Sequence, residues 1–161
     1  KQQELFMDLA KKNNSIQFLM ICPQSSDKEY YDKIKNEKKK IKNLEFIDFV
    51  SYTEIDRYFR KAKLFVNTSL YEGFPNTFIQ AFMSSTPVLS LNVNPDEIIT
   101  KYECGIYCNG DIELMNREVY TLYENKEFYK KLAQNAYNYA KSFHDIKKNV
   151  KKLMTIFKEQ I

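Results

Sequence analysis

The sequence predicts an α/β fold in which helices flank a doubly wound parallel sheet, with extra helices at the C-terminal end. Short, continuously apolar runs alternate with longer amphipathic segments over the first two-thirds of the chain, which is typical of βαβ units. Beyond Asp111 the pattern is helical almost to the end. The 161 residues suit one domain, residues 1–161, which is large enough to bury a core without disulfides or a metal.

The expected strands are short apolar runs, the first of which is closed by Cys22-Pro23. Such runs suit strands that are buried on both faces of a parallel sheet. In such sheets, ligands bind beyond the carboxyl ends of the strands. We expect strands at Ile16–Ile21, Leu44–Ile47, Leu64–Asn67, Val88–Leu91 and Ile106–Tyr107.

Helices are expected between and after these strands. Thr53 is a plausible N-cap for one of them, and Asn94-Pro95-Asp96-Glu97 resembles a helix start with proline at the first helical position. The expected helices are a first one running to about Asn13, then Asp27–Ile41, Thr53–Ala62, Pro75–Ser84, Asp111–Tyr123, Lys126–Ser142 and Asp145–Gln160.

The net charge of +4 is concentrated in two lysine-rich stretches. Both read as solvated helix faces, or as surfaces attracted to anionic lipid, where each lysine adds about 1 kcal/mol. No recognition motif accompanies the charge, so nucleic acid is not an expected partner. No apolar run approaches the ~20 residues of a membrane-spanning helix, so we expect a cytoplasmic protein, with the inner face of the cell membrane as an alternative site. The lysines are Lys33, Lys35, Lys38, Lys39, Lys40 and Lys42, and Lys147, Lys148, Lys151 and Lys152.

Cysteine and histidine do not indicate a metal site. Cys22, Cys104 and Cys108 are an odd number of cysteines without framework spacing, which favours reduced thiols. The sole histidine, His144, is far from them in sequence, so zinc is not expected. For His144 itself we expect packing or capping at the start of the last helix rather than catalysis.

The segment after Leu64–Asn67 contains the residues that we expect to bind a ligand. Gly73 lets the backbone turn tightly and approach a ligand, and Pro75 sets the first turn of a helix whose free amides favour a phosphate. Glu72, just outside that helix, can accept hydrogen bonds from ligand hydroxyls, and Gln80 can bond a second hydroxylated group. A phosphate flanked by two polyhydroxyl groups is the outline of a nucleotide sugar, although Glu72-Gly73 alone also fits an ordinary turn with a solvated carboxylate.

At these residues the sequence resembles the retaining glycosyltransferases of family four, which have the two-domain GT-B fold. Glu72-Gly73-Phe74 matches the front of their signature, and Ala81 and Pro87-Val88 match the back. The segment Glu-Gly-Phe-Pro-Asn-Thr-Phe, from Glu72 to Phe78, is similar to the corresponding segment in one bacterial branch of the family. The resemblance covers nearly the whole chain. It implies that the chain is the C-terminal, donor-binding half of such an enzyme and that this half is Rossmann-like. It also implies a role for the enzyme in polysaccharide biosynthesis.

The resemblance implies a role for each matching residue. Glu72 would hold the donor sugar, position 80 would reach the ribose, and the loop after Leu44–Ile47 would frame the base. No cofactor or divalent metal is implied, because helix-start amides and basic side chains would stabilise the leaving diphosphate. The implied donor-binding residues are the backbone of Gly73, Phe74, Pro75, Asn76 and Thr77, with Gln80, Phe49, Val50, Ser51 and Tyr52.

The sequence departs from the family pattern in three respects. Gln80 replaces an acidic residue, so a ribose bond there lacks charge assistance, and Ser85 replaces the usual glycine before Pro87. The family's phosphate-binding Arg and Lys lie upstream of the first helix, which would place them outside this chain. The same comparison implies that one central strand and the N-terminal domain, which binds the acceptor, belong to a longer parent.

Three functions are therefore compatible with the sequence. The first is the donor-binding domain of a metal-independent, retaining hexosyltransferase-like enzyme that moves a sugar to a glycan or lipid-linked acceptor, the chain alone being inactive. The second is a non-catalytic nucleotide-binding module. The third is a structural or membrane-docking domain that uses its lysine-rich helices for peripheral contact, and fold alone does not choose among the three.

Overall fold

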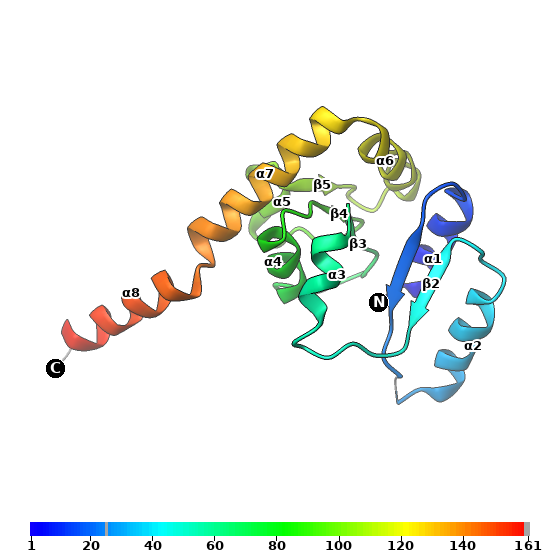
Figure 1. Cartoon of the computed structure of the whole chain (residues 1–161), viewed down its shortest axis with the longest axis horizontal. Helices are drawn as coiled ribbons and strands as arrows, with labels where there is room; N and C mark the ends of the chain where they lie inside the picture. The colour runs from blue at the N-terminus through cyan, green and yellow to red at the C-terminus, as the bar shows by residue number, and fades with distance from the viewer. Residues whose placement is uncertain (25, 160–161) are drawn as a thin grey trace.

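The computed structural model describes residues 1–24 and 26–159 (Figure 1). The strands are β1 (Phe18–Ile21), β2 (Leu44–Ile47), β3 (Phe65–Asn67), β4 (Val88–Ser90) and β5 (Gly105–Tyr107). The helices are α1 (Gln3–Lys12), α2 (Lys28–Lys38), α3 (Ile55–Lys61), α4 (Asn76–Met83), α5 (Ile98–Lys101), α6 (Ile112–Glu124), α7 (Lys126–Phe143) and α8 (Ile146–Glu159), with a 3₁₀ turn, η1 (Pro95–Glu97), before α5. The predicted α/β order is confirmed, and the expected helix end at Gln160 lies outside the described residues.

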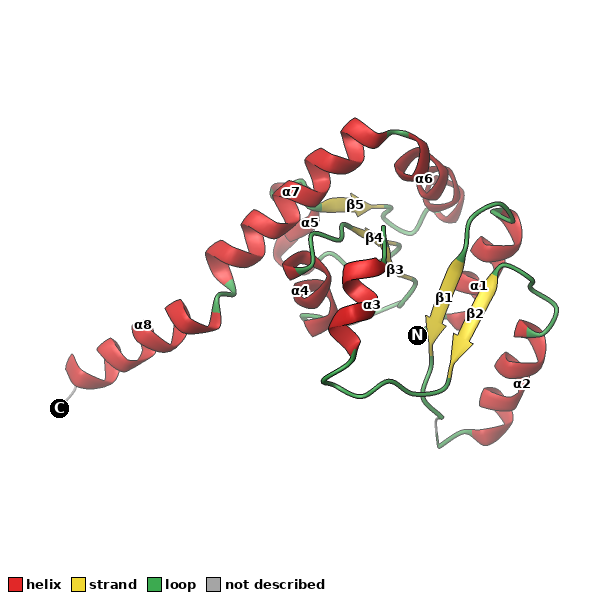
Figure 2. Ribbon diagram, viewed as in Figure 1, coloured by secondary structure: helices red, strands yellow, loops and turns green. Residues whose placement is uncertain are grey.

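The strands form two parallel sheets. β1 pairs with β2, so that Phe18 lies opposite Leu44. β4 pairs with both β3 and β5, so that Leu89 lies opposite Val66 on one side and Ile106 on the other. Helices flank both sheets (Figure 2). This is the parallel, helix-flanked architecture that the sequence predicts. The strands form two separate sheets rather than one, because β1 and β3 do not pair with each other.

A groove of about 1070 Å³ lies between β1 and β3. Strands β1 and β3 line it, together with Phe6 of α1 and with Val119 and Leu122 of α6. Well-packed protein interiors rarely contain voids larger than a water molecule, whereas this groove has the volume of roughly 35 waters at ~30 Å³ each. It is therefore a feature of the architecture rather than a packing defect.

The backbone of both bordering strands has unused hydrogen-bonding groups toward the groove. The Phe18 amide donates toward the β2 side and the Phe65 amide donates toward β4. Because alternate residues of a parallel strand bond to opposite neighbours, the amides of Leu19, Ile21 and Val66 face the groove. β1 and β3 thus each have a free edge on it.

The core has two parts: one includes residues of both sheets, among them Phe18 of β1 and Leu89 of β4, and the other includes Val88 of β4. Helices α1, α2 and α6 contribute to the first part, and α3, α4, α5 and α7 contribute to the second. Phe78 and Phe82 of α4 are fully buried, which confirms that this helix packs on the sheet. The deepest large side chains also include Met7, Leu9, Ile34, Leu44, Leu89, Ile99 and Met115. The helix that carries Gln80 is therefore held firmly against the sheet.

One expected helix start is wrong, and another is confirmed only in part. Helix α3 begins at Ile55 after Glu54, whose side chain makes no capping bond, so Thr53 is not its N-cap. Pro95 opens only the short turn η1, in which Asp96 and Glu97 have φ angles of 48° and 56°. These left-handed residues interrupt the helix because their φ values do not fit an α-helical turn.

The departure at Ser85 has a structural reason. Its φ angle is 57°, in the left-handed region that glycine adopts at least cost. The turn therefore has at Ser85 a backbone conformation that suits glycine, although this residue carries a side chain.

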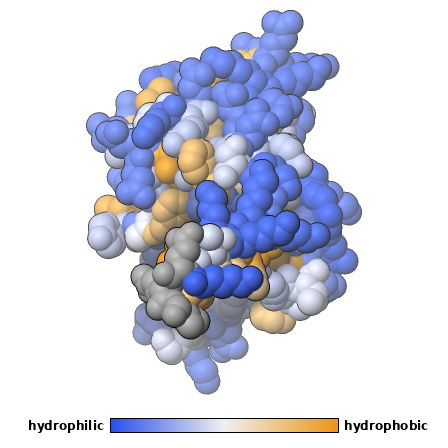
Figure 3. All heavy atoms as spheres, turned by 90° about the vertical axis from the view of Figure 1, so that its left-hand side faces the viewer, coloured by the Kyte–Doolittle hydropathy of each residue, from blue (hydrophilic) through white to orange (hydrophobic). Residues whose placement is uncertain are grey.

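Helix α8 extends away from the rest of the molecule (Figure 1). Its apolar side chains recur at helical spacing and are exposed, between 45% and 74% of their surface, at Ile146, Val150, Leu153, Met154, Ile156 and Phe157. Viewed from this end, apolar surface lies beside strongly hydrophilic surface (Figure 3). In the part of the chain that the structure describes, no helix is long and apolar enough to cross a membrane.

Candidate donor-binding site

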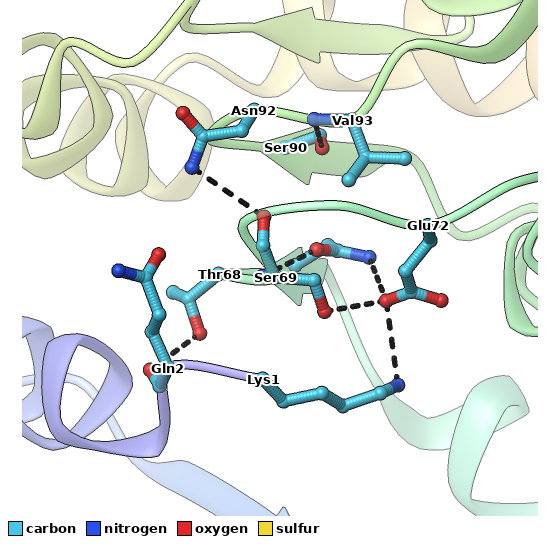
Figure 4. Close-up of polar contacts among 9 residues, drawn as sticks. Lys1, Gln2, Thr68, Ser69, Glu72, Ser90, Asn92 and Val93 are labelled. Carbon is cyan, nitrogen blue, oxygen red and sulfur yellow. Dashed lines mark hydrogen bonds and ion pairs between the residues drawn. The ribbon is translucent and has the colours of Figure 1, made fainter.

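The candidate site lies where β3 and β4 end. The chain leaves β3 through Thr68 and Ser69 and turns back at Glu72 to begin α4, while the chain after β4 passes above it (Figure 4). The first residues of the chain reach the same place, because the Thr68 hydroxyl donates a 2.9 Å hydrogen bond to the carbonyl of Gln2. This is the edge of a parallel sheet at which ligands bind.

Polar neighbours hold the Glu72 carboxylate in place. Oε1 accepts hydrogen bonds from the Ser69 hydroxyl and, at 3.2 Å, from the Asn67 amide. Asn67 is fixed in turn, because its Oδ1 accepts the Ser69 backbone N–H at 2.8 Å. Burial alone raises the pKa of Glu72, but the hydrogen bond from Ser69, the charge of Lys1 and the hydrogen bond from Asn67 outweigh it, so the pKa lies below its ordinary value. Glu72 is therefore an ionised acceptor near neutral pH.

Lys1 is a site residue that sequence reasoning missed. Its ammonium lies 3.4 Å from Oε1 of Glu72, whereas we expected no basic residue to face the motif. The side chain of Lys1 is 61% exposed and that of Glu72 is 20% exposed, so the ammonium remains accessible to a ligand. The available signal was its position two residues ahead of the first helix, whose start lies at the edge of the sheet where β3 ends.

The start of α4 offers a set of free backbone donors. The amide of Phe78 donates to Pro75, so the helix begins its own hydrogen bonds there. Among the described residues, no acceptor receives the amides of Gly73, Phe74, Asn76 or Thr77. Pro75 is the N-cap rather than the first helical residue. Free amides at a helix start favour an anion, as the sequence predicts for this turn.

Gly73 leaves open space beside the backbone. A Cβ added there would meet nothing within 4 Å, so a ligand can approach the main chain closely. Gln80 lies one turn further along α4, is half-buried and has no hydrogen-bond partner among the described residues. The side chain is therefore available to a ligand, and its expected ribose contact stays a prediction.

The structure does not join the loop after β2 to this site. Phe49 and Tyr52 are 72% and 85% exposed, and no described contact links the segment Phe49, Val50, Ser51 and Tyr52 with Glu72 or α4. Its internal order comes from Ser51, whose hydroxyl bonds Glu54 at 2.7 Å. The expected role of this loop at the base stays a prediction.

No cluster of three or more His, Cys, Asp or Glu side chains suited to a metal ion occurs within residues 1–24 and 26–159. The three cysteines are free thiols, as expected. His144 packs on aromatic rings, as expected, but it is the C-cap of α7 rather than a cap at the start of the last helix.

Comparison with known proteins now identifies the family. The model of the "Glycosyl transferases group 1" family matches residues 1–139. This chain belongs to the group 1 glycosyl transferases. The match begins at Lys1 and includes the whole segment from Glu72 to Val88, so the residues gathered at the end of β3 belong to the family region.

Among relatives of this group 1 glycosyl transferase is an alpha-monoglucosyldiacylglycerol synthase from Acholeplasma laidlawii. It is 28% identical over 137 residues, which cover 83% of this chain and 33% of the synthase. The chain thus spans about one third of the length of this curated relative.

Two solved structures show the same fold. One is the C-terminal domain of the group 1 glycosyl transferase LpcC from Francisella tularensis, with a TM-score of 0.78 and 22% identity, covering 91% of this chain and 80% of that domain. The other is HepE from Anabaena in complex with UDP-glucose, with a TM-score of 0.83 and 15% identity, covering 99% of this chain and 45% of that protein. The chain therefore has the architecture of a GT-B C-terminal domain.

Proposed function

We propose that this chain is the donor-binding domain of a retaining, metal-independent glycosyltransferase. Its parent transfers a hexose from a nucleotide diphosphate sugar to a glycan or lipid-linked acceptor. The observation that carries the proposal is the convergence of an ionised carboxylate, an ammonium and four free amides at one edge of a parallel sheet. The UDP-glucose complex of HepE and the name of the Acholeplasma synthase support a nucleotide sugar and a lipid acceptor.

Each group has a distinct task in this proposal. The Glu72 carboxylate accepts hydrogen bonds from donor-sugar hydroxyls and orients the sugar for transfer. The amides from Gly73 to Thr77 and the ammonium of Lys1 bind the diphosphate, and they stabilise the charge that grows on it as the glycosidic bond breaks. Gln80 bonds the ribose, and the loop after β2 frames the base. No divalent metal is required, since fixed donors supply the positive potential.

We further propose that a strand of the parent polypeptide, leading directly into Lys1, fills the groove between β1 and β3. The amides of Leu19, Ile21 and Val66 face the groove and would bond this strand on both edges. The bond from Thr68 already holds Gln2 at the end of the groove, and the buried Oε1 of Gln2 has no donor among the described residues. The strand would place Lys1 opposite Glu72.

The complete parent is then required for turnover, because the acceptor domain must close over the donor. We expect this chain alone to bind the donor without transferring sugar. A calorimetric screen against uridine, guanosine and adenosine diphosphates and their sugar conjugates tests donor binding. Preference for one nucleotide, with tighter binding of its sugar conjugate, supports the proposal. Failure of every nucleotide to bind, also in the chain extended upstream by the additional strand, contradicts it.

A second candidate function, peripheral docking on an anionic membrane, is favoured by α8. This helix pairs the exposed apolar face described above with lysines that form no ion pair among the described side chains, namely Lys147, Lys148, Lys151, Lys152 and Lys158. By contrast, several lysines of α2 are compensated, as in the 3.0 Å pair of Lys35 with Asp48. Amphipathic basic helices bind the headgroup region of anionic bilayers. We propose α8, rather than α2, as the membrane contact at the cytoplasmic face.

Sedimentation with vesicles tests this contact. The protein should pellet with vesicles that contain anionic phosphatidylglycerol and remain free with neutral phosphatidylcholine. Replacing Leu153 and Phe157 by glutamate should abolish pelleting, while replacing Lys38 and Lys39 at the end of α2 by glutamine should leave it unchanged. Equal pelleting of both variants, or pelleting with neutral vesicles, argues against docking through α8.

A further inference from the structure

His144 is fixed to the end of α7. Its backbone N–H donates a 2.8 Å hydrogen bond to Ala140, which closes the last turn of the helix. Its ring nitrogen Nε2 lies 3.2 Å from the Tyr139 hydroxyl, and the two ring centroids are 5.4 Å apart. Tyr139 itself is buried and contacts Phe82 of α4. The position of the imidazole is therefore fixed by the end of α7 and by the buried Tyr139.

Phe74, from the loop that carries the donor-binding amides, rests on this imidazole. The ring centroids of Phe74 and His144 are 5.5 Å apart at an interplanar angle of 34°. No other ring contacts Phe74 among the described residues. The preceding loop is open, because Leu70 and Tyr71 are 67% and 87% exposed and Gly73 has no neighbouring atoms where a Cβ would stand. The stacking contact therefore tethers Phe74 between Glu72, which Ser69 and Asn67 hold by hydrogen bonds, and the buried Pro75.

We propose that His144 is a positioning residue for donor binding, which acts through Phe74 to hold the loop between Glu72 and the start of α4 in its binding conformation. The inference rests on the proposed function, since it concerns the same site. Contacts of this kind raise affinity by ordering a loop before the ligand arrives, so that less conformational entropy is lost on binding. Removing one such tether typically costs roughly threefold to tenfold in affinity.

The contact favours a neutral imidazole. Burial lowers the pKa of His144 below its ordinary value, because a charged ring in this position loses its hydration. The stacked state therefore binds fewer protons than the released state. The stabilising contribution of the His144–Phe74 contact is fully present above pH ~6.5. It is lost as the pH falls through the lower pKa of the stacked ring.

The other ionisable groups around the ring keep their charge over the same range. Lys141 and Asp145 form a 2.9 Å ion pair in which the pKa of Lys141 is raised and that of Asp145 is lowered. The pKa of Tyr139 is raised to about 12 by burial. In the loop the pKa of Glu72 is lowered, and the helix α4 contains no ionisable side chain. His144 is thus the group that changes charge here between pH 7.5 and 5.5.

Three variants separate positioning from general stability. His144→Ala removes the ring, His144→Phe keeps a flat ring that cannot be protonated, and Tyr139→Phe removes only the hydroxyl contact. Calorimetry gives the donor affinity at pH 7.5 and 5.5, thermal melting reports folding, and amide relaxation at Gly73 and Phe74 reports loop mobility without ligand. The last measurement tests the tether even if no nucleotide binds, which distinguishes its failure from failure of the proposed function.

We expect His144→Ala to increase mobility at Phe74 and to weaken donor binding roughly threefold to tenfold at pH 7.5. His144→Phe should restore both and should lack the decrease in donor affinity that we expect for the unchanged protein at pH 5.5. Tyr139→Phe should bind as the unchanged protein does at pH 7.5. Unaltered mobility at Phe74 in His144→Ala overturns the inference, as does a pH dependence that persists in His144→Phe.

Discussion

The ammonium of Lys1 lies 3.4 Å from the Glu72 carboxylate and joins the first residues of the chain to the loop after β3. The two charges face the same small volume at the edge of the sheet, beside the free amides that open α4. Without a ligand they compensate each other. With a donor bound, we expect the ammonium to turn to phosphate and the carboxylate to the sugar, so that both parts of a nucleotide sugar meet a matching charge.

Removal of the Lys1 charge should weaken binding of the free nucleotide diphosphate and of its sugar conjugate alike. Hydrogen bonds to charged groups contribute about 1.5–3 kcal/mol, so Lys1→Met should reduce both affinities roughly tenfold to a hundredfold. Lys12→Met is the matched control, because Lys12 pairs with Glu113 at 2.8 Å, away from the site. Calorimetry measures both variants. Equal affinities of Lys1→Met and Lys12→Met would remove Lys1 from the proposed site.

Two glycine substitutions distinguish binding from folding. At Gly73 an added Cβ meets no protein atom, so Gly73→Ala should melt at an unchanged temperature and yet lose donor affinity, because the ligand approaches that backbone. At Gly105 the Cβ would lie 2.0 Å from the Val88 carbonyl oxygen, so Gly105→Ala should lower the free energy of unfolding by about 3 kcal/mol. Calorimetry and thermal melting give both values. Unchanged donor binding in Gly73→Ala speaks against a close backbone approach.

The pH dependence of sugar recognition should follow Glu72. Its folded-state pKa lies below the ordinary value near 4.5, so the contribution of the carboxylate is complete above pH 4.5 and is lost as the pH falls through the lower folded pKa. Ser69→Ala removes a hydrogen bond that lowers this pKa and should move the loss to higher pH. Carboxyl NMR shifts and donor titrations at several pH values report it. An identical Glu72 titration in Ser69→Ala would contradict the assigned cause.

A strand in the groove changes hydrogen exchange at known amides. In this chain the amides of Leu19, Ile21 and Val66 should exchange fast, because they face the groove and no acceptor within residues 1–24 and 26–159 receives them. In the chain extended upstream by the proposed strand they should be protected about as well as the Phe18 amide, which is already bonded. Sedimentation distinguishes a strand in the same molecule from one donated by a second copy. Fast exchange at all three amides in the extended monomer would rule out a strand there.

Local patterns explain why so much of the fold could be predicted. The apolar runs and their helical neighbours are contiguous in sequence, so β2 was predicted at its observed bounds and α4 within one or two residues. The Glu72-Gly73-Phe74 turn was also a local signal, since β3, turn and α4 follow one another.

The remaining features depend on contacts between distant segments. Thr53 has the chemistry of an N-cap, but the backbone at Ser51 already accepts the first amides of that turn, at 3.0 and 3.1 Å. Lys1 has no sequence neighbour that connects it with Glu72; only the return of the chain to the end of β3 brings them together. The stacking of His144 on Phe74 likewise depends on the packing of α7 against α4. Such pairings are set by tertiary structure rather than by a local pattern.

The central claim is that Glu72 recognises the sugar of the donor, and a comparison of two affinity ratios tests it most directly. Calorimetry gives the affinity of the preferred sugar conjugate relative to its free nucleotide diphosphate, in the unchanged protein and in Glu72→Ala. We predict that Glu72→Ala lowers this ratio roughly tenfold, equivalent to ~1.4 kcal/mol, while the free diphosphate still binds through the amides and Lys1. The same ratio in both proteins would contradict the account, because the sugar would then be held without Glu72.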